Sequence, residues 1–209
     1  MKKITLMIAA ATLMVCNSFA QKNYNEEISL GFKVGANYSN VYDSQGEEFT
    51  ADSKFGWATG AFLSIPIGHF LGVQPEVLFS QKGYKGSGSV IGSEFNYTRT
   101  TNFIDVPLLL ALKPSPQITL LAGPQFSYLI KESYVFESAL VNIDRQEELK
   151  NDNIRKNILC FLGGIDFNLN NVVIGTRVGW DLQTNKGDGT STTPRYKNMW
   201  YQATVGFRL

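Results

Sequence analysis

The feature that most constrains the fold of this 209-residue chain is a period-two alternation of apolar with small or polar side chains. Over residues 30–39, Leu, Phe, Val, Ala and Tyr alternate with Gly, Lys, Gly, Asn and Ser. Successive side chains of a β-strand point to opposite faces, so this spacing predicts a strand with one apolar and one polar face. We therefore expect an all-β fold.

The alternation recurs along the whole chain and predicts eight strands. In the fourth strand, Phe103 falls out of phase with the apolar face. The strands are about 12–15 residues long, whereas strands of globular proteins usually have about five or six residues. The expected strands cover about 30–39, 55–66, 71–84, 97–112, 118–136, 155–168, 172–183 and 199–209.

The connections between these strands are expected to alternate between long and short. Long loops are predicted at Gly86 to Ser93, at Glu137 to Asn153 with room for a short helix, and at Thr184 to Thr193. Short turns are predicted near 67–70, 113–116 and 169–171. Tight periplasmic turns and long extracellular loops are typical of outer-membrane barrels. We therefore predict an eight-stranded antiparallel up-and-down transmembrane β-barrel.

Composition is consistent with such a barrel once the alternation is considered. The chain is 44% hydrophobic, with a mean hydropathy of −0.09. After residue 20 it lacks the roughly 18 consecutive apolar residues that a spanning helix requires. Barrel strands are apolar on one face only, so their average hydropathy is also close to zero. The net charge of +1 gives no basic surplus, and we expect no nucleic-acid partner.

Residues 1–20 are expected to be a cleaved signal peptide, which leaves residues 21–209 as the barrel domain. Met1-Lys2-Lys3 is cationic, the segment from Ile4 to Val15 is apolar, and Ser18-Phe19-Ala20 ends in a small-x-small pattern. Cys16 leaves a lipoprotein-type signal as the alternative. Cleavage leaves a single cysteine, Cys160, so no internal disulfide can form, and we interpret Cys160 as a small apolar filler.

The alternation also places a set of polar side chains inside the barrel. An eight-stranded barrel is only wide enough for side chains to fill, so these residues are expected to form a paired, hydrogen-bonded plug. Arg177 and Arg208 are expected to meet Glu76, Asp105 or Asp166 across the lumen; a proton or substrate relay is the alternative. The candidate lumen residues are Lys33, Glu76, Asp105, Gln125, Asp166, Arg177, Asp181, Gln202 and Arg208.

Few residues point to catalysis. His69 is the only histidine, and it lies in a short turn at the end opposite the outer rim where we would expect a catalytic site. The mixed charges around Glu147, Glu148 and Asp152 favour a solvated loop over a calcium site. We expect no enzyme activity, no cofactor and no metal. Aromatic residues near the strand ends are candidates for interfacial girdles, among them Tyr38, Phe55, Trp57, Tyr84, Tyr97, Phe103, Tyr134, Phe136, Trp180, Trp200 and Tyr201.

Four segments carry a resemblance to a known family: Phe32 to Asn37, Asp105 to Leu110, Ala122 to Leu129 and Gly163 to Phe167. They resemble the small outer-membrane β-barrel proteins of Bacteroidetes, the PorT-like or "porin family" proteins. This resemblance implies a fold and a location in the cell outer membrane. It does not imply a reaction or a ligand.

The resulting expectation is a monomeric outer-membrane protein with a structural or loop-mediated binding role, accessory to secretion or surface assembly. The expected partners are outer-membrane lipid, a surface partner bound through the long loops, and the barrel-assembly machinery, which would recognise the last strand with Phe207 and Leu209. One alternative is a narrow porin-like diffusion channel. Another is a soluble periplasmic lipocalin-like binder, whose apolar strand faces would point inward.

Overall fold

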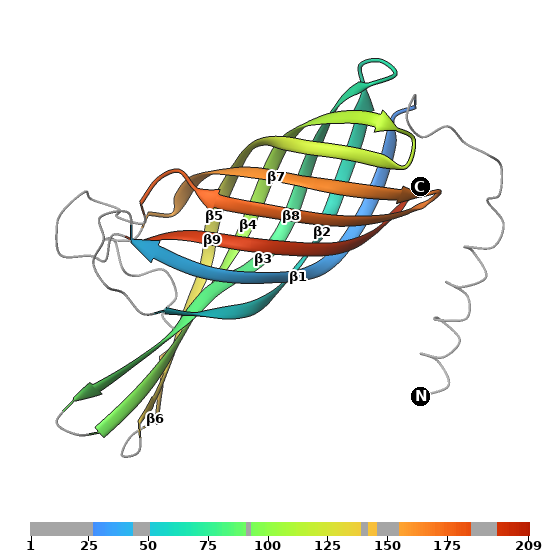
Figure 1. The fold of residues 1–209 in the computed structure, drawn as a ribbon. Helices are drawn as coiled ribbons and strands as arrows, with labels where there is room; N and C mark the ends of the chain where they lie inside the picture. The colour runs from blue at the N-terminus through green and yellow to red at the C-terminus, as the bar shows by residue number, and fades with distance from the viewer. Residues whose placement is uncertain (1–26, 44–50, 91–92, 139–141, 146–154, 185–195) are drawn as a thin grey trace, which may run out of the picture.

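The computed structural model describes residues 27–43, 51–90, 93–138, 142–145, 155–184 and 196–209. The expected signal peptide and most of the 184–193 loop lie outside these residues. The described part contains eight long strands that close into a barrel (Figure 1), together with a short strand, β6 (Asn142–Arg145), that pairs only with β5. The wall strands are β1 (Ser29–Asp43), β2 (Ala51–Pro66), β3 (Leu71–Val90), β4 (Ser93–Ser115), β5 (Ile118–Ser138), β7 (Asn157–Leu169), β8 (Val172–Asp181) and β9 (Tyr196–Arg208).

Each wall strand is antiparallel to its neighbours, and the pairing of β1 with β9 closes the ring. The ring order is β1, β2, β3, β4, β5, β7, β8, β9. The prediction of an eight-stranded antiparallel barrel is therefore confirmed. Among the described residues no helix has the length and apolarity needed to span a membrane.

The two faces of the wall differ sharply in polarity. On β1, Val34 is 60% exposed and Lys33 is 5% exposed. The other wall strands also turn apolar side chains outward, while the interior holds the buried polar and charged side chains together with an apolar cluster that includes Leu109, Leu121 and Leu162. A soluble barrel would bury its apolar face, so the lipocalin-like alternative is wrong. An apolar outer wall around a polar interior is the arrangement that a lipid bilayer stabilises.

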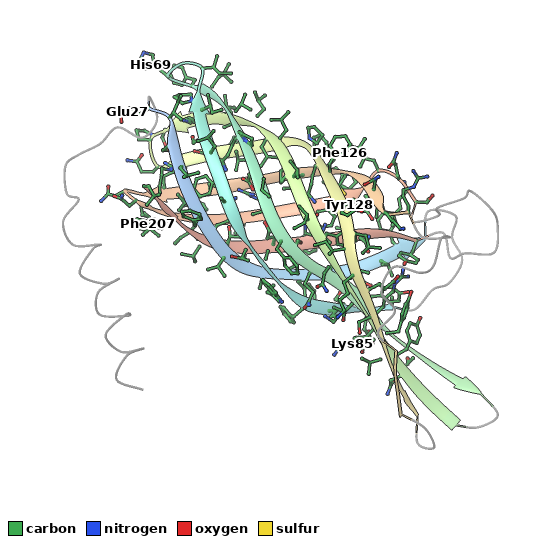
Figure 2. The ribbon with its side chains drawn as sticks, turned by 180° about the vertical axis from the view of Figure 1, so that it is seen from behind. Glu27, His69, Lys85, Phe126, Tyr128 and Phe207 are labelled. Atoms are coloured by element: carbon green, nitrogen blue, oxygen red, sulfur yellow. The ribbon has the colours of Figure 1, made fainter. Side chains whose placement is uncertain are left out.

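Aromatic side chains form a band on the outer wall. Tyr38 lies 4.8 Å from Phe55 between ring centroids, and Phe161 lies 5.3 Å from Trp180. Phe126 and Tyr128 continue the band on β5, where Figure 2 shows them on the outer side of the barrel. The girdle expectation is wrong for Tyr84, Phe103 and Trp200, which are buried in the interior. Phe103 is in phase with Asp105, since odd-numbered β4 residues from Arg99 to Lys113 face inward.

The short turns lie at one end of the barrel, together with Glu27 and the C-terminal strand end (Figures 1 and 2). They comprise residues 67–70, 116–117 and 170–171, and Asn170 adopts a left-handed φ of 55° that asparagine tolerates. The expected turn at 113–116 is shifted, because β4 continues to Ser115, which pairs with Ile118. We call this the turn end and the opposite end the loop end.

The predicted loop from Gly86 to Ser93 is wrong. β3 and β4 stay paired as a hairpin up to Val90 and Ser93, and this hairpin projects beyond the barrel (Figure 1). A Cβ on Gly86 would lie 2.3 Å from the Tyr97 ring, so glycine at this position lets the tyrosine of the next strand cover the backbone. Pairing therefore outweighs the loop propensity of the Gly/Ser-rich segment.

The predicted loop from Glu137 to Asn153 is also partly wrong. Glu137 and Ser138 belong to β5. Residues 142–145 form β6, which pairs with β5 from Tyr134 to Glu137 within the segment that we expected to be a loop. The remaining residues of this segment lie outside the described part of the chain.

Candidate functional site

The nine candidate lumen residues all lie in the barrel interior, and none is more than 5% exposed. They come from seven of the eight wall strands, because the inward positions of each strand are fixed by the alternation. Their contacts divide them into groups at different heights along the barrel axis. Lys33, Glu76, Asp166 and Arg177 form the first group, which we call the central charge cluster.

Glu76 is the hub of the central charge cluster. Its Oε1 lies 2.7 Å from Lys33 Nζ, and its Oε2 lies 2.6 Å from Arg177 Nη1. Arg177 Nη2 also lies 3.3 Å from Asp166 Oδ2, and Gln74 donates a 2.9 Å hydrogen bond to Glu76. Two positive and two negative charges compensate one another there, which is the condition for burying ions without a large free-energy cost.

Asp105 belongs to a second group nearer the loop end. We expected it to meet an arginine, but its partner is Lys82, with 3.1 Å between Asp105 Oδ2 and Lys82 Nζ. Lys82 Nζ also lies 3.6 Å from the centroid of the Trp200 ring and 4.9 Å from that of Phe103. Sequence reasoning missed Lys82, although the inward phase of β3 runs through Glu76 and Ser80 to this position.

The remaining candidates are held mainly by neutral groups. Arg208 donates a 2.9 Å hydrogen bond to Asn168 near the turn end, and Gln202 donates one to Asn37. Gln125 donates to Ser127. Asp181 accepts hydrogen bonds from the Asn198 backbone at 2.9 Å and from the Cys160 thiol at 3.2 Å. Cys160 is therefore buried, as expected. We interpreted it as an apolar filler, but its thiol also donates a hydrogen bond to Asp181.

A cluster of aromatic residues surrounds a further ion pair at the loop end. Arg99 on β4 pairs with Glu132 on β5. The guanidinium carbon of Arg99 lies 4.7 Å from the centroid of the Tyr196 ring, 5.1 Å from that of Tyr134 and 6.0 Å from that of Tyr84. Burial raises the pKa of both Tyr84 and Tyr134, so both phenols are neutral at physiological pH. We call these five residues the mouth cluster; sequence reasoning identified none of them as an interior residue.

Above the mouth cluster, four strands continue as a sheet outside the barrel. We call this the projecting sheet; it comprises residues 86–90, 93–98, 135–138 and 142–145. Lys85 lies at its base (Figure 2). β2 pairs with β3 only as far as Gly86, so β3 beyond that point is an edge strand of this sheet among the described residues. Edge strands and their faces are common sites of protein contact.

His69 is exposed in the bend between β2 and β3, and Figure 2 shows it at the turn end. Within the described ranges, no group of three or more His, Cys, Asp or Glu residues is arranged to hold a metal ion.

Comparison with known proteins gives one family. The family model described as outer membrane protein beta-barrel domain matches residues 19–185. A search of curated proteins finds no match. Two similar solved structures are Ail, the attachment invasion locus protein of Yersinia pestis, in complex with the heparin analogue sucrose octasulfate, and Neisserial surface protein A.

For Ail the identity is 16%, the match covers 88% of this chain and 99% of Ail, and the TM-score is 0.49. For Neisserial surface protein A the identity is 12%, the match covers 88% of this chain and 100% of that protein, and the TM-score is also 0.49. The outer membrane protease OmpT of Escherichia coli is 11% identical over 88% of this chain and 94% of OmpT, with a TM-score of 0.39.

Proposed function

Because the chain belongs to the outer membrane protein beta-barrel domain family, we propose that it is a closed membrane anchor that presents its projecting sheet to a partner outside the cell. By the sidedness of outer-membrane barrels, the turn end faces the periplasm and the loop end faces outward. The proposal thus divides the molecule into an anchor within the lipid and a binding surface above it. We propose no catalytic role, since His69 lies at the periplasmic end.

The observation that carries the closed-anchor proposal is the compensation of charge inside the barrel. A diffusion channel requires a continuous water-filled path through the barrel. Here Lys33, Glu76, Asp166 and Arg177 contact one another, and the Lys82 ammonium group is covered by Trp200. At the extracellular mouth, the tyrosines of the mouth cluster surround Arg99. These contacts support a packed lumen over the narrow porin-like channel.

Recording from planar bilayers tests the closed lumen. We expect no conductance steps from the purified barrel under conditions in which a known porin conducts. The heat-dependent shift of its mobility on a gel serves as proof of folding. Regular ion-conducting steps from folded protein would overturn the closed-anchor proposal in favour of the channel.

The projecting sheet is the proposed binding surface. The β3–β4 hairpin of this sheet can be shortened without changing the strand register, since Gly86 pairs with Tyr97 and Ser87 pairs with Asn96. Deleting residues 87–96 and joining Gly86 to Tyr97 through a short turn is expected to leave the barrel folded. Cross-linking and pull-down from the native outer membrane then compare this variant with the full chain and with His69→Ala, which alters the opposite end. A partner captured equally by all three proteins would exclude the hairpin.

A finer assignment rests on the sequence segments. We propose that the chain is a PorT-like protein of Bacteroidetes, accessory to secretion or surface assembly, because Asp105 to Leu110 and Ala122 to Leu129 resemble that group. The expected state is a monomer inserted by the barrel-assembly machinery through its last strand, with no nucleic-acid partner. Deletion of the gene in its host is expected to change the set of surface-exposed proteins, and an unchanged set would contradict the accessory role.

A further inference from the structure

The outer wall is not uniformly covered by side chains. Between β7, β8 and β9 it has a groove of about 350 Å³, lined by Gly163, Gly164, Ile165, Thr176, Arg177, Val178 and Tyr201. The groove starts at the height of Tyr201, which pairs with Tyr38 in the extracellular aromatic band, and extends toward Thr176. It therefore lies in the outer half of the part of the wall that contacts lipid.

The groove exists because side chains are missing at its base. No heavy atom lies within 4 Å of the position where a Cβ on Gly163 would be. The partners of Gly163 on the neighbouring strands are Ala122 on β5 and Val178 on β8. Both have short side chains, so neither fills the space beside Gly163. Gly163 shows no positive φ, so the backbone at this position accepts a larger residue. The backbone conformation of β7 therefore does not require glycine at position 163.

Basic side chains lie above the groove, on the extracellular side of the aromatic band. Lys197 is four residues beyond Tyr201 on β9, about 13 Å along the strand. Arg155 precedes β7, and its Nε donates a 3.1 Å hydrogen bond to the Thr184 carbonyl, which fixes it near the end of β8.

Among the rim residues whose side chains the structure describes, most of the charged ones are basic. Asp52 is an exposed acid there, whereas Glu132 and Asp181 are buried and face inward. The basic residues of the rim are Lys54, Lys85, Lys131, Arg155, Lys156 and Lys197. A basic rim above a membrane boundary attracts anionic lipid headgroups.

We propose that the groove binds one lipid molecule with an anionic phosphate headgroup. One acyl chain lies along Gly163, Val178 and Tyr201, and the phosphate contacts Lys197. The apolar lining at membrane depth matches an acyl chain, and the basic rim above it matches a phosphate. This inference rests on the placement of the barrel in the outer membrane and is independent of the role of the projecting sheet.

Native mass spectrometry of the intact barrel, released from mild detergent, tests the proposal with two lipids of equal chain length. Phosphatidylglycerol is the anionic probe and phosphatidylcholine the zwitterionic one. The wild-type protein is expected to retain one phosphatidylglycerol, with about fivefold preference over phosphatidylcholine, since one lysine near a membrane surface contributes an attraction of that order. Equal retention of the two lipids would overturn the headgroup part of the proposal.

Two substitutions separate the headgroup from the chain. Lys197→Gln is expected to remove the preference for phosphatidylglycerol, whereas Lys54→Gln, on β2 away from the groove, retains it. Gly163→Leu fills the groove and is expected to reduce retention of both lipids about tenfold. Ala61→Leu, on the outer face of β2, is the matched control and is expected to bind as the wild type does. Unchanged retention by Gly163→Leu would identify the bound lipid as nonspecific.

Further measurements check that each variant folds and test two other occupants of the groove, an inorganic anion and a second copy of the chain. Each variant is checked for heat-dependent gel mobility, and Gly163→Ala replaces Gly163→Leu if the larger residue prevents folding. Inorganic phosphate alone is expected neither to bind nor to displace the lipid, and displacement by it would show a simple anion site. A dimer mass that disappears with Gly163→Leu would show that a second copy of the chain occupies the groove, and would also overturn the proposal.

Discussion

Arg177 and Glu76 contact each other across the full width of the barrel, with 2.6 Å between Arg177 Nη1 and Glu76 Oε2. Arg177 is on β8 and Glu76 is on β3, and β9, β1 and β2 lie between them in the ring. In an eight-stranded ring, strands four steps apart are on opposite sides. The pair therefore ties opposite walls together, and Lys33 and Asp166 complete its charge balance.

The first prediction concerns the loss of one partner from this pair. Glu76→Gln leaves Lys33 and Arg177 with only Asp166 as a described acidic partner, and a buried charge without compensation is costly. We expect the free energy of unfolding to fall by about 3–5 kcal/mol. The measurement is the urea dependence of the heat-modifiable gel shift. Glu76→Ala is expected to show at least the same loss.

A double variant and a neighbour provide the controls. Glu76→Gln combined with Arg177→Met removes charge of both signs and is expected to recover part of the stability. Val77→Ala changes the adjacent residue, whose side chain faces outward. If Glu76→Gln and Val77→Ala unfold at the same urea concentration, the central charge cluster does not stabilise the barrel.

The alternation predicts the face of a residue well but not its height in the barrel. Lys33 and Glu76 are placed inside by parity alone, because a strand has no other way to orient alternate side chains. The partner of Asp105 depends on the stagger between strands. The pairing shifts between Ser53 and Ala58 on β2, and between Asn102 and Phe103 on β4, change that stagger. No local pattern encodes these shifts, so the pairing of Asp105 with Lys82 could not be predicted, although parity alone places Lys82 inside.

The ends of the strands are the other part that local pattern does not determine. Gly86 is a loop-former by propensity, yet it lies within a strand because the Tyr97 ring and a continuous ladder cover it. The same holds for β6, whose partner is the extended end of β5. In both places the neighbouring strand supplies the hydrogen bonds. The sequence of Gly86 and its neighbours, or of β6, does not show where that neighbouring strand lies.

The second prediction uses the three tryptophans as reporters of the two faces of the wall. Trp57 is 48% exposed on the outer wall, whereas Trp200 is 1% exposed beside Lys82. In bilayers with brominated acyl chains, we expect strong fluorescence quenching of a variant that retains only Trp57. A variant that retains only Trp200, made by Trp57→Phe and Trp180→Phe, is expected to resist quenching. Equal quenching of the two variants would contradict the assignment of faces.

The third prediction concerns Gly83, the one described glycine with a positive φ, at 151°. A Cβ at this position would lie 2.0 Å from the Arg99 carbonyl oxygen, and the Gly83 N–H donates a 2.9 Å hydrogen bond to Ser39. We expect Gly83→Ala to destabilise the barrel by about 1–3 kcal/mol through backbone strain. Gly68→Ala is the control, because nothing lies within 4 Å of its Cβ position. Similar unfolding midpoints for the two variants would show that the β3–β4 pairing relaxes around Gly83.

The last prediction tests whether water reaches the lumen at the level of Cys160, which pairs with Asp181 at the end of β8. Cys160 is fully buried, and its thiol contacts Asp181 at 3.2 Å and Ser127 at 3.4 Å. In protein that lacks residues 1–20, we expect a maleimide reagent to label Cys160 only after heating, because labelling requires the barrel to open. Ser87→Cys, on the exposed edge of the projecting sheet, is expected to react at once under the same conditions. If Cys160 in the folded barrel reacts as fast as that surface cysteine, the interior is open to solvent at its level, and the closed anchor would have to be replaced by a channel.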